Sequence, residues 1–179
     1  MDGPAQPLPR PTPISGIALR ACAEADLPFL RRVHADARAA EMALVTDWTE
    51  AQRRDFLRFQ FDAQHRHYLE HDPGADFDLI LAHGRPVGRL YVCDLGEEVR
   101  LMDIALLAVE RNRGLGTALM RMLMDRAAAR GQPLSLHVED ENPAKRLYLR
   151  LGFREGGRVS FYRRMDWHPP AGAAGRALS

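Results

Sequence analysis

A basic, glycine-containing loop holds the residues that are best suited to chemistry. It spans residues 111–116 and reads RNRGLG, between a predicted apolar strand and a predicted helix. A helix N-terminus carries unpaired backbone N–H groups and a partial positive charge. Gly114 and Gly116 lack a Cβ, so an anion can approach these amides closely, and Arg111 and Arg113 add positive charge. The loop is therefore predicted to bind a diphosphate group.

Three phosphate-binding patterns compete for this loop. A P-loop needs a Lys-Ser/Thr pair after its last glycine, but Thr117 and Ala118 follow Gly116, so this pattern fails. A dinucleotide fingerprint needs a third glycine where Leu119 stands, although Glu139 could imitate its ribose-binding acid. A dinucleotide-dependent oxidoreductase is therefore the weaker alternative. The third pattern is [Q/R]-x-x-G-x-[G/A]. The loop matches it with Arg111, Gly114 and Gly116.

A second block lies downstream of this loop. Residues 142–153 read NPAKRLYLRLGF, which is similar to the segment N-x-x-A-x-x-x-Y-x-x-x-G-F of a known family. With both motifs in the expected order, the chain from Ile17 to Asp166 resembles a GNAT (GCN5-related) N-acetyltransferase. The loop departs from the usual pattern at Asn112, a residue type that tolerates left-handed backbone geometry, so we expect the loop to be kept.

The resemblance implies a fold and a cosubstrate. The fold is α/β (mixed α+β): a mostly antiparallel, twisted sheet of about seven strands, flanked by about four helices. A V-shaped split separates the fourth and fifth strands, which correspond to residues 99–107 and 134–138. Acetyl-CoA lies in this split in the family, and its peptide-like pantetheine arm would pair with the strand edge near Leu106 and Ala108. No metal is implied.

The same resemblance implies a set of cosubstrate-binding residues. The amides of the glycine loop would hold the diphosphate, Asn142 would contact the pantetheine arm, and Lys145 would reach a phosphate. The full set is Leu106, Ala108, Arg111, Asn112, Arg113, Gly114, Leu115, Gly116, Thr117, Asn142 and Lys145.

The reaction needs a neutral amine and a protonated leaving thiol. Tyr148 matches the acid of the family, and its ordinary pKa of about 10 lies above the roughly 8.5 of a thiol, so the two must be close. Packing on the sheet is the alternative role for Tyr148. Asp103 interrupts an apolar run and is the candidate base, or else it pairs with a neighbouring strand or an arginine. Glu98 or a water molecule could replace it.

The resemblance therefore implies an acyltransferase. It would transfer an acetyl group from acetyl-CoA to a primary amine, by direct attack in a ternary complex. The acceptor, a small molecule, an amino acid or a protein, is not identified by the sequence. A catalytically silent acyl-CoA-binding module of the same fold is the first alternative, and the oxidoreductase is the second.

The elements that must position these residues form one predicted domain, residues 15–167. The tails, residues 1–14 and 168–179, are predicted to be flexible. Asp26 is expected to cap a first helix and Thr49 a second, longer one. Apolar residues at helical spacing predict the buried face of the second helix: Phe56, Phe59, Ala63 and Tyr68.

Composition narrows the possible partners and location. The chain has 179 residues and a formal net charge of +1, which gives no overall field for nucleic acid. It has two cysteines and no apolar run near the roughly 20 residues of a membrane span, so we expect a cytoplasmic protein without a membrane partner. His67 and His71 are one helical turn apart but have no evident third ligand. The strand 161–167 could be an edge that pairs two copies into a homodimer.

Overall fold

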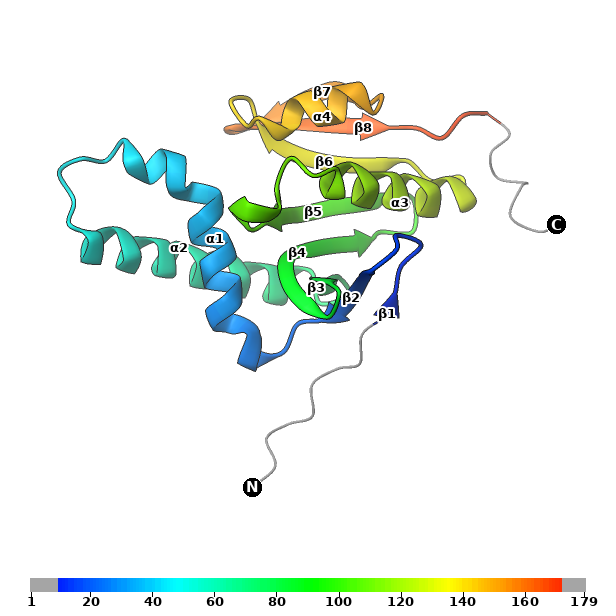
Figure 1. Ribbon diagram of the computed structural model, residues 1–179. Coiled ribbons are helices and arrows are strands. Elements are labelled where there is room, and N and C mark those ends of the chain that lie inside the picture. The colour runs from blue at the N-terminus through cyan, green and yellow to red at the C-terminus, as the bar shows by residue number, and fades with distance from the viewer. Residues whose placement is uncertain (1–9, 172–179) are drawn as a thin grey trace. The chain divides into compact units, whose positions relative to one another are not determined.

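The structure, a computed structural model, describes residues 10–171 (Figure 1). These residues divide into two compact units. The first contains residues 10–91 and 103–113, and the second contains residues 92–102 and 114–171. Strands β4 (Arg85–Asp94) and β5 (Val99–Leu106) contribute residues to both. No helix among the described residues is long and apolar enough to cross a membrane.

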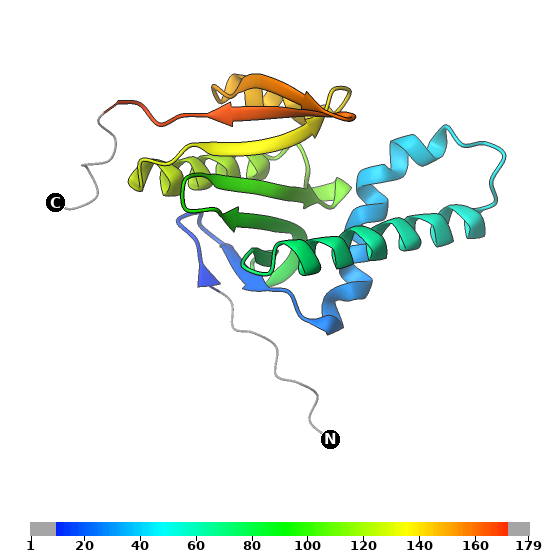
Figure 2. The same cartoon turned by 180° about the vertical axis from the view of Figure 1, so that it is seen from behind.

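The first unit is a sheet covered by a helical hairpin. The short strand β1 (Arg10–Pro11) pairs antiparallel with β2 (Ile17–Ala21), which pairs antiparallel with β3 (Asp76–Ala82), and β4 and β5 follow in the strand order. Helices α1 (Leu27–Ala43) and α2 (Glu50–His71) form the hairpin, and α2 lies across the strands (Figure 2). Arg10 and Pro11 of the predicted N-terminal tail are thus part of the sheet, and residues 1–9 and 172–179 of the two tails lie outside the described residues.

The start of α2 follows the sequence prediction, but its buried face does not. The Thr49 hydroxyl accepts a hydrogen bond from the Gln52 amide at 3.2 Å, and the Gln52 side chain accepts one from the Thr49 amide at 2.8 Å, a complete capping box. The predicted apolar face was wrong, because Phe59 is 73% exposed while Phe61 is buried. Phe61 packs in one core cluster with Leu30, Leu79 and Leu81.

The cap predicted for α1 also differs in detail. Asp26 occupies the N-cap position, but its carboxylate makes no capping bond to α1. Instead it accepts two hydrogen bonds from Arg20, at 2.8 and 3.0 Å, and one from the amide of Ala23. Both side chains of the pair are buried. The carboxylate of Asp26 therefore pairs with the guanidinium group of Arg20 and does not cap the N-terminus of α1. A short 3-10 helix, Glu24–Asp26, leads into α1.

The second unit contains a parallel strand pairing. Strands β5 and β6 (Leu134–Glu139) are parallel over three residue pairs, which end at Leu101 and Leu136. Strand β6 then pairs antiparallel with β8 (Tyr162–Trp167), and β8 with β7 (Arg154–Val159). Helix α3 (Leu115–Ala129) runs beside β6, and the short helix α4 (Ala144–Arg150) also packs on this strand (Figure 1). The predicted fold class is confirmed.

The edge strand of this unit is not the one that the sequence suggested. Strand β8 is paired on both sides, by β6 and by β7, so it has no free edge to offer a second copy. The chain places β7 last in the order, and every residue of β7 is exposed. The prediction that residues 161–167 form an edge was therefore wrong, because the final strand inserts next to β6 instead of adding beyond β7.

Candidate functional site

The glycine loop has the backbone geometry that its sequence predicted. A short 3-10 helix, Ala108–Glu110, precedes it. Asn112 has φ of 60° and Gly114 has φ of 83°, both in the left-handed region, and Gly114 is the N-cap of α3. The first intrahelical hydrogen bond of α3 joins the Ala118 amide to the Gly114 carbonyl at 3.0 Å. The amides that precede it, from Leu115 to Thr117, are the donors that a helix N-terminus leaves for an anion.

The two glycines have open space where a side chain would start. A Cβ built on Gly114 would meet no atom within 4 Å, and one on Gly116 would meet only Leu147 Cδ2, at 3.9 Å. Among the two arginines, Arg113 is largely exposed and lies 3.6 Å from Glu110, whereas Arg111 Nε donates to the backbone carbonyl of Leu106 at 3.0 Å. The loop can therefore receive a diphosphate without moving a side chain packed on its glycines.

Two backbone groups predicted to pair with the pantetheine arm already have partners. The Leu106 carbonyl accepts from Arg111, and the Ala108 amide donates to the carboxylate of Asp36 on α1, at 3.1 Å. Between them, the Leu107 amide donates to Val87 of β4 at 2.9 Å. No feature of the sequence pointed to Asp36, because a single acid on a polar helix face resembles any solvated residue.

A glycine on β4, which sequence reasoning missed, allows this strand to lie close to β5. A Cβ on Gly88 would lie 2.3 Å from the Ala105 carbonyl oxygen and 2.8 Å from Leu106 Cδ2, closer than real contacts.

We expect Gly88→Ala to lower the free energy of unfolding by about 1–3 kcal/mol, because β4 or β5 must shift to make room for the added Cβ. In thermal unfolding each kcal/mol corresponds to about 2–4 °C in Tm. Gly74→Ala, whose Cβ would meet nothing within 4 Å, is the matched control, and equal Tm values for the two variants would contradict the close approach.

The candidate base, Asp103, lies against a buried arginine of the neighbouring strand. Asp103 Oδ2 is 2.7 Å from an Nη atom of Arg89, and the Arg89 side chain is only 4% exposed. The guanidinium also lies over the rings of Phe61 and Tyr91, at 5.5 and 5.6 Å from their centroids. The carboxyl group of Asp103 therefore lies beside a buried guanidinium group. Sequence reasoning named an arginine partner as the alternative, but offered no means to pick Arg89.

The substitute base, Glu98, is engaged elsewhere. Its carboxylate accepts from Arg164 at 2.5 Å and from Arg100 at 2.7 Å. Burial alone would raise the pKa of Glu98, but these two hydrogen bonds outweigh it and hold the pKa below its ordinary value. Glu98 is therefore a poor candidate for a base.

The candidate acid, Tyr148, is held on α4 in the second unit. Its side chain is 5% exposed, and its ring lies 5.8 Å from that of Phe153 at a tilt of 55°. The backbone reinforces this contact, since the Phe153 amide donates to the Tyr148 carbonyl at 3.0 Å. The phenol is therefore fixed by packing of the ring and by the turn that ends α4.

Asn142 and Lys145 both have local partners. The Asn142 side-chain oxygen accepts from the Ala144 amide at 2.9 Å, so this residue caps the turn before α4. One residue separates Asn142 from Ala144, where the family segment N-x-x-A has two, so the sequence match is one position out of register there. Lys145 Nζ lies 3.2 Å from Asp140 and 3.0 Å from Glu155. It reaches these carboxylates within its own unit.

Asp140 is the centre of this charged cluster, and its titration makes the stability of the protein depend on pH. Hydrogen bonds from Arg163 and Lys145 lower the pKa of Asp140 to about 2. A lowered folded-state pKa stabilises the protein above the ordinary value near 3.8, and this stabilisation is lost as the pH falls toward 2. We therefore expect Asp140→Asn to have a lower Tm than the parent at pH 7 and the same Tm near pH 2. A constant difference between the two Tm values across this range would contradict the pairing.

The histidine pair shows no metal-binding arrangement. The rings of His67 and His71 are stacked with centroids 4.1 Å apart, and His71 Nδ1 donates to the His67 carbonyl at 2.9 Å. Within residues 10–171, no group of three His, Cys, Asp or Glu side chains could hold a metal ion.

Comparison with known proteins agrees with the geometry of the loop. The family model described as Acetyltransferase (GNAT) family matches residues 41–153, more than half of the chain. Comparison with curated protein sequences gives no significant match.

Solved structures resemble the whole fold at low sequence identity. PaiA N-acetyltransferase from Thermoplasma acidophilum, in complex with coenzyme A, is 14% identical, with a TM-score of 0.63 over 85% of this chain and 98% of that one. An acetyltransferase from Thermus thermophilus is 23% identical, with a TM-score of 0.59 over 85% and 96%. RimL, a ribosomal L7/L12 alpha-N-protein acetyltransferase in complex with coenzyme A, is 16% identical, with a TM-score of 0.60 over 90% and 98%. At these identities the likeness concerns the fold.

Proposed function

The chain belongs to the acetyltransferase (GNAT) family, and from this premise we propose that it transfers the acetyl group of acetyl-CoA to a primary amine by direct attack in a ternary complex. The start of α3 carries the proposal. Its amides from Leu115 to Thr117 precede the first intrahelical bond, and the left-handed backbone at Asn112 and Gly114 opens the loop toward an anion. Structures of two proteins with this fold contain coenzyme A, which supports the same cosubstrate here.

The strand edge after β5 is the proposed place for the pantetheine arm. A peptide-like arm needs one backbone acceptor and one donor, and the Leu106 carbonyl and the Ala108 amide supply them. Arg111 and Asp36 contact these two groups in the structure. On this proposal, both side chains are exchanged for the amide groups of the cosubstrate when it binds. Asn142 then contacts the arm, and Lys145 exchanges a carboxylate for a phosphate.

Acetyl-CoA supplies the acyl group: a bond forms between the amine nitrogen and the acetyl carbon, the carbon–sulfur bond breaks, and one proton passes from nitrogen to sulfur. Tyr148 is the proposed proton donor to the departing thiolate. Its ring packs against Phe153 at the end of α4, and this packing positions the hydroxyl. A fixed donor avoids the reorganisation that bulk water would need.

Asp103 is the proposed acceptor of the amine proton, directly or through water. Its contact with Arg89 fixes the carboxylate, and the side chain keeps 17% exposure. We expect Asp103→Asn to lower kcat/KM for the amine about tenfold, less than a typical loss of a general base, because water can take the proton. Thermal unfolding of the variant must accompany the assay, since Arg89 loses its counter-charge. Unchanged kcat/KM in a folded variant would remove Asp103 from the mechanism.

The proposed function is tested by a thiol-release screen over a mixed library of amines, peptides and amino acids. Mass spectrometry of the product then identifies the acetylated group. We expect acceptor-dependent thiol release with at least one amine class. Binding of acetyl-CoA without any acceptor-dependent release would instead identify a silent acyl-CoA-binding module.

A further inference from the structure

A groove between the two helices of the hairpin has no part in the proposed reaction. We call it the α1–α2 groove; it has a volume of about 600 Å³. Its lining residues come only from these helices: Pro28, Arg31, Arg32, Ala35, Ala39, Met42, Glu50, Arg53, Arg54, Leu57 and Arg58. We propose that the α1–α2 groove is a docking surface for an amphipathic helix that carries acidic side chains.

The groove is a regular feature of the two helices. Ala35, Ala39 and Met42 follow each other at helical spacing on α1, on the opposite side of this helix from the buried Leu30 and Val33. On α2, Leu57 lies one turn before the buried Phe61 and continues the same face. The inner face of α2 therefore covers the core at Phe61 and lines the groove at Leu57. Small and apolar residues form a floor to which another helix can pack closely.

The rim of the groove has an excess of positive charge. Five arginines line it against a single carboxylate, Glu50. Two further acids lie close: Asp62 contacts Arg31 and Arg58, and Asp55 contacts Arg54. With these acids included, the groove keeps a net charge of two positive units, although the whole chain carries only +1. The charge is therefore concentrated here.

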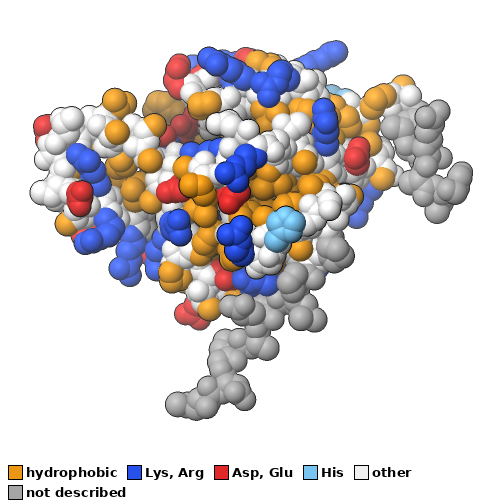
Figure 3. Space-filling view, in the orientation of Figure 1, with side chains coloured by type: hydrophobic (Ala, Val, Ile, Leu, Met, Phe, Trp, Pro, Cys, Tyr) orange, Lys and Arg blue, Asp and Glu red, His pale blue; other side chains and the backbone are white. Residues whose placement is uncertain are grey.

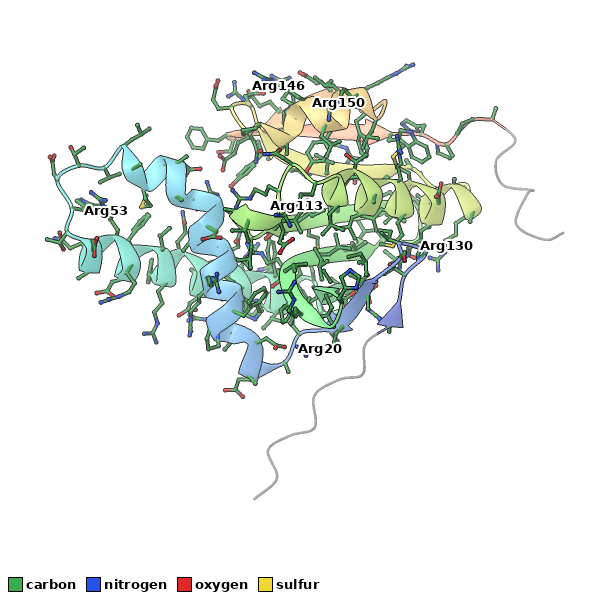
Figure 4. The ribbon with its side chains drawn as sticks, viewed as in Figure 1. Arg20, Arg53, Arg113, Arg130, Arg146 and Arg150 are labelled. Carbon is green, nitrogen blue, oxygen red and sulfur yellow. The ribbon has the colours of Figure 1, made fainter. Side chains whose placement is uncertain are left out.

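Two of the arginines are available to bind the acidic side chains of a docking helix. Among the interactions of the described residues, Arg32 and Arg53 have no carboxylate partner. One Nη atom of Arg53 donates to the Val45 carbonyl at 2.7 Å, which holds its side chain between the helices (Figure 4). Apolar and basic side chains lie side by side on this part of the surface (Figure 3). An apolar floor with a basic rim is complementary to a helix with leucines on one face and glutamates beside it.

The test uses a labelled synthetic peptide with leucines at positions i, i+3, i+4 and i+7 and glutamates elsewhere, and a control peptide with glutamine for every glutamate. Fluorescence anisotropy with the full chain should show binding of the acidic peptide that weakens as salt is raised. The double variant Arg32→Glu/Arg54→Glu should bind at least about tenfold more weakly, since two attractive charges become repulsive. The variant Arg66→Glu/Arg85→Glu makes the same change in net charge outside the groove and should bind like the parent.

A bulky residue in the apolar floor of the α1–α2 groove provides a second test, which leaves the charges unchanged. Ala39→Trp should weaken the peptide as strongly as the double arginine change, with an unaltered far-UV CD spectrum. The proposal is overturned if the glutamine peptide binds as well as the acidic one, or if neither binds. It is also overturned if the groove variants instead abolish self-association in sedimentation or binding to anionic lipid vesicles, which would identify a second copy or a membrane as the occupant. None of these measurements depends on acetyl transfer.

Discussion

Gly114→Asp is expected to weaken acetyl-CoA binding at least about tenfold more than Gly114→Asn. Both replacements tolerate the left-handed backbone at this position and are good N-cap residues, so α3 should start normally in each. They differ by one negative charge, placed where a Cβ meets open space. Two like charges about 4 Å apart repel by about 1 kcal/mol in water and about 4 kcal/mol in a partly shielded site, and tenfold corresponds to about 1.4 kcal/mol.

Isothermal titration of the two Gly114 variants with acetyl-CoA measures this difference. Gly96→Asp and Gly96→Asn form the control pair, because Gly96 also has a left-handed φ and open space but lies in the turn between β4 and β5. The control pair should bind acetyl-CoA alike. Equal affinities in the Gly114 pair would mean that no anion binds beside this residue.

Tyr148→Phe is expected to lower kcat about 100-fold and to leave the affinity for acetyl-CoA unchanged. Phenylalanine keeps the packing against Phe153 and the buried position of the ring, so only the hydroxyl is lost. An interaction made only in the transition state lowers kcat and kcat/KM equally. Steady-state kinetics over a range of pH checks this, and the variant should also lose any high-pH limb that deprotonation of the phenol gives to the parent.

Tyr162→Phe is the matched control for this experiment, because Tyr162 lies on β8 and is 41% exposed. It should keep the kcat of the parent. A Tyr148→Phe variant with full kcat on the best acceptor would assign Tyr148 to packing alone.

Features set by a few neighbouring residues could be predicted from the sequence. The capping box of Thr49 and Gln52 depends on a four-residue pattern, and the left-handed positions at Asn112 and Gly114 on the conformational freedom of those residue types. The mixed fold class, with β5 and β6 as a parallel pair within it, followed from the resemblance of two motifs rather than from the strands themselves.

Features that depend on distant partners could not be predicted. On α2, the stripe through Phe56 and Phe59 and the stripe through Leu57 and Phe61 both have helical spacing. Packing against Leu30, Leu79 and Leu81, which are distant in sequence, decides that Phe61 is buried. In the same way, Asp26 has a good cap residue type, but the buried Arg20 takes its carboxylate.

The contacts that the candidate site residues make with distant residues could not be predicted either. Asp103 and Arg89 lie on adjacent strands, and their pairing depends on the register of β4 and β5. Asp36 reaches Ala108 only because α1 packs beside the end of β5, 72 positions along the chain. Gly88 carries no motif, and its need for a missing Cβ is evident only from the close approach of Ala105.

The most direct test of the central claim is a crystal structure of the protein with coenzyme A bound. The account predicts diphosphate oxygens within about 2.7–3.2 Å of the amide nitrogens at the start of α3, from Leu115 to Thr117. A diphosphate bound elsewhere, with these amides facing solvent or bonded within the chain, would contradict it.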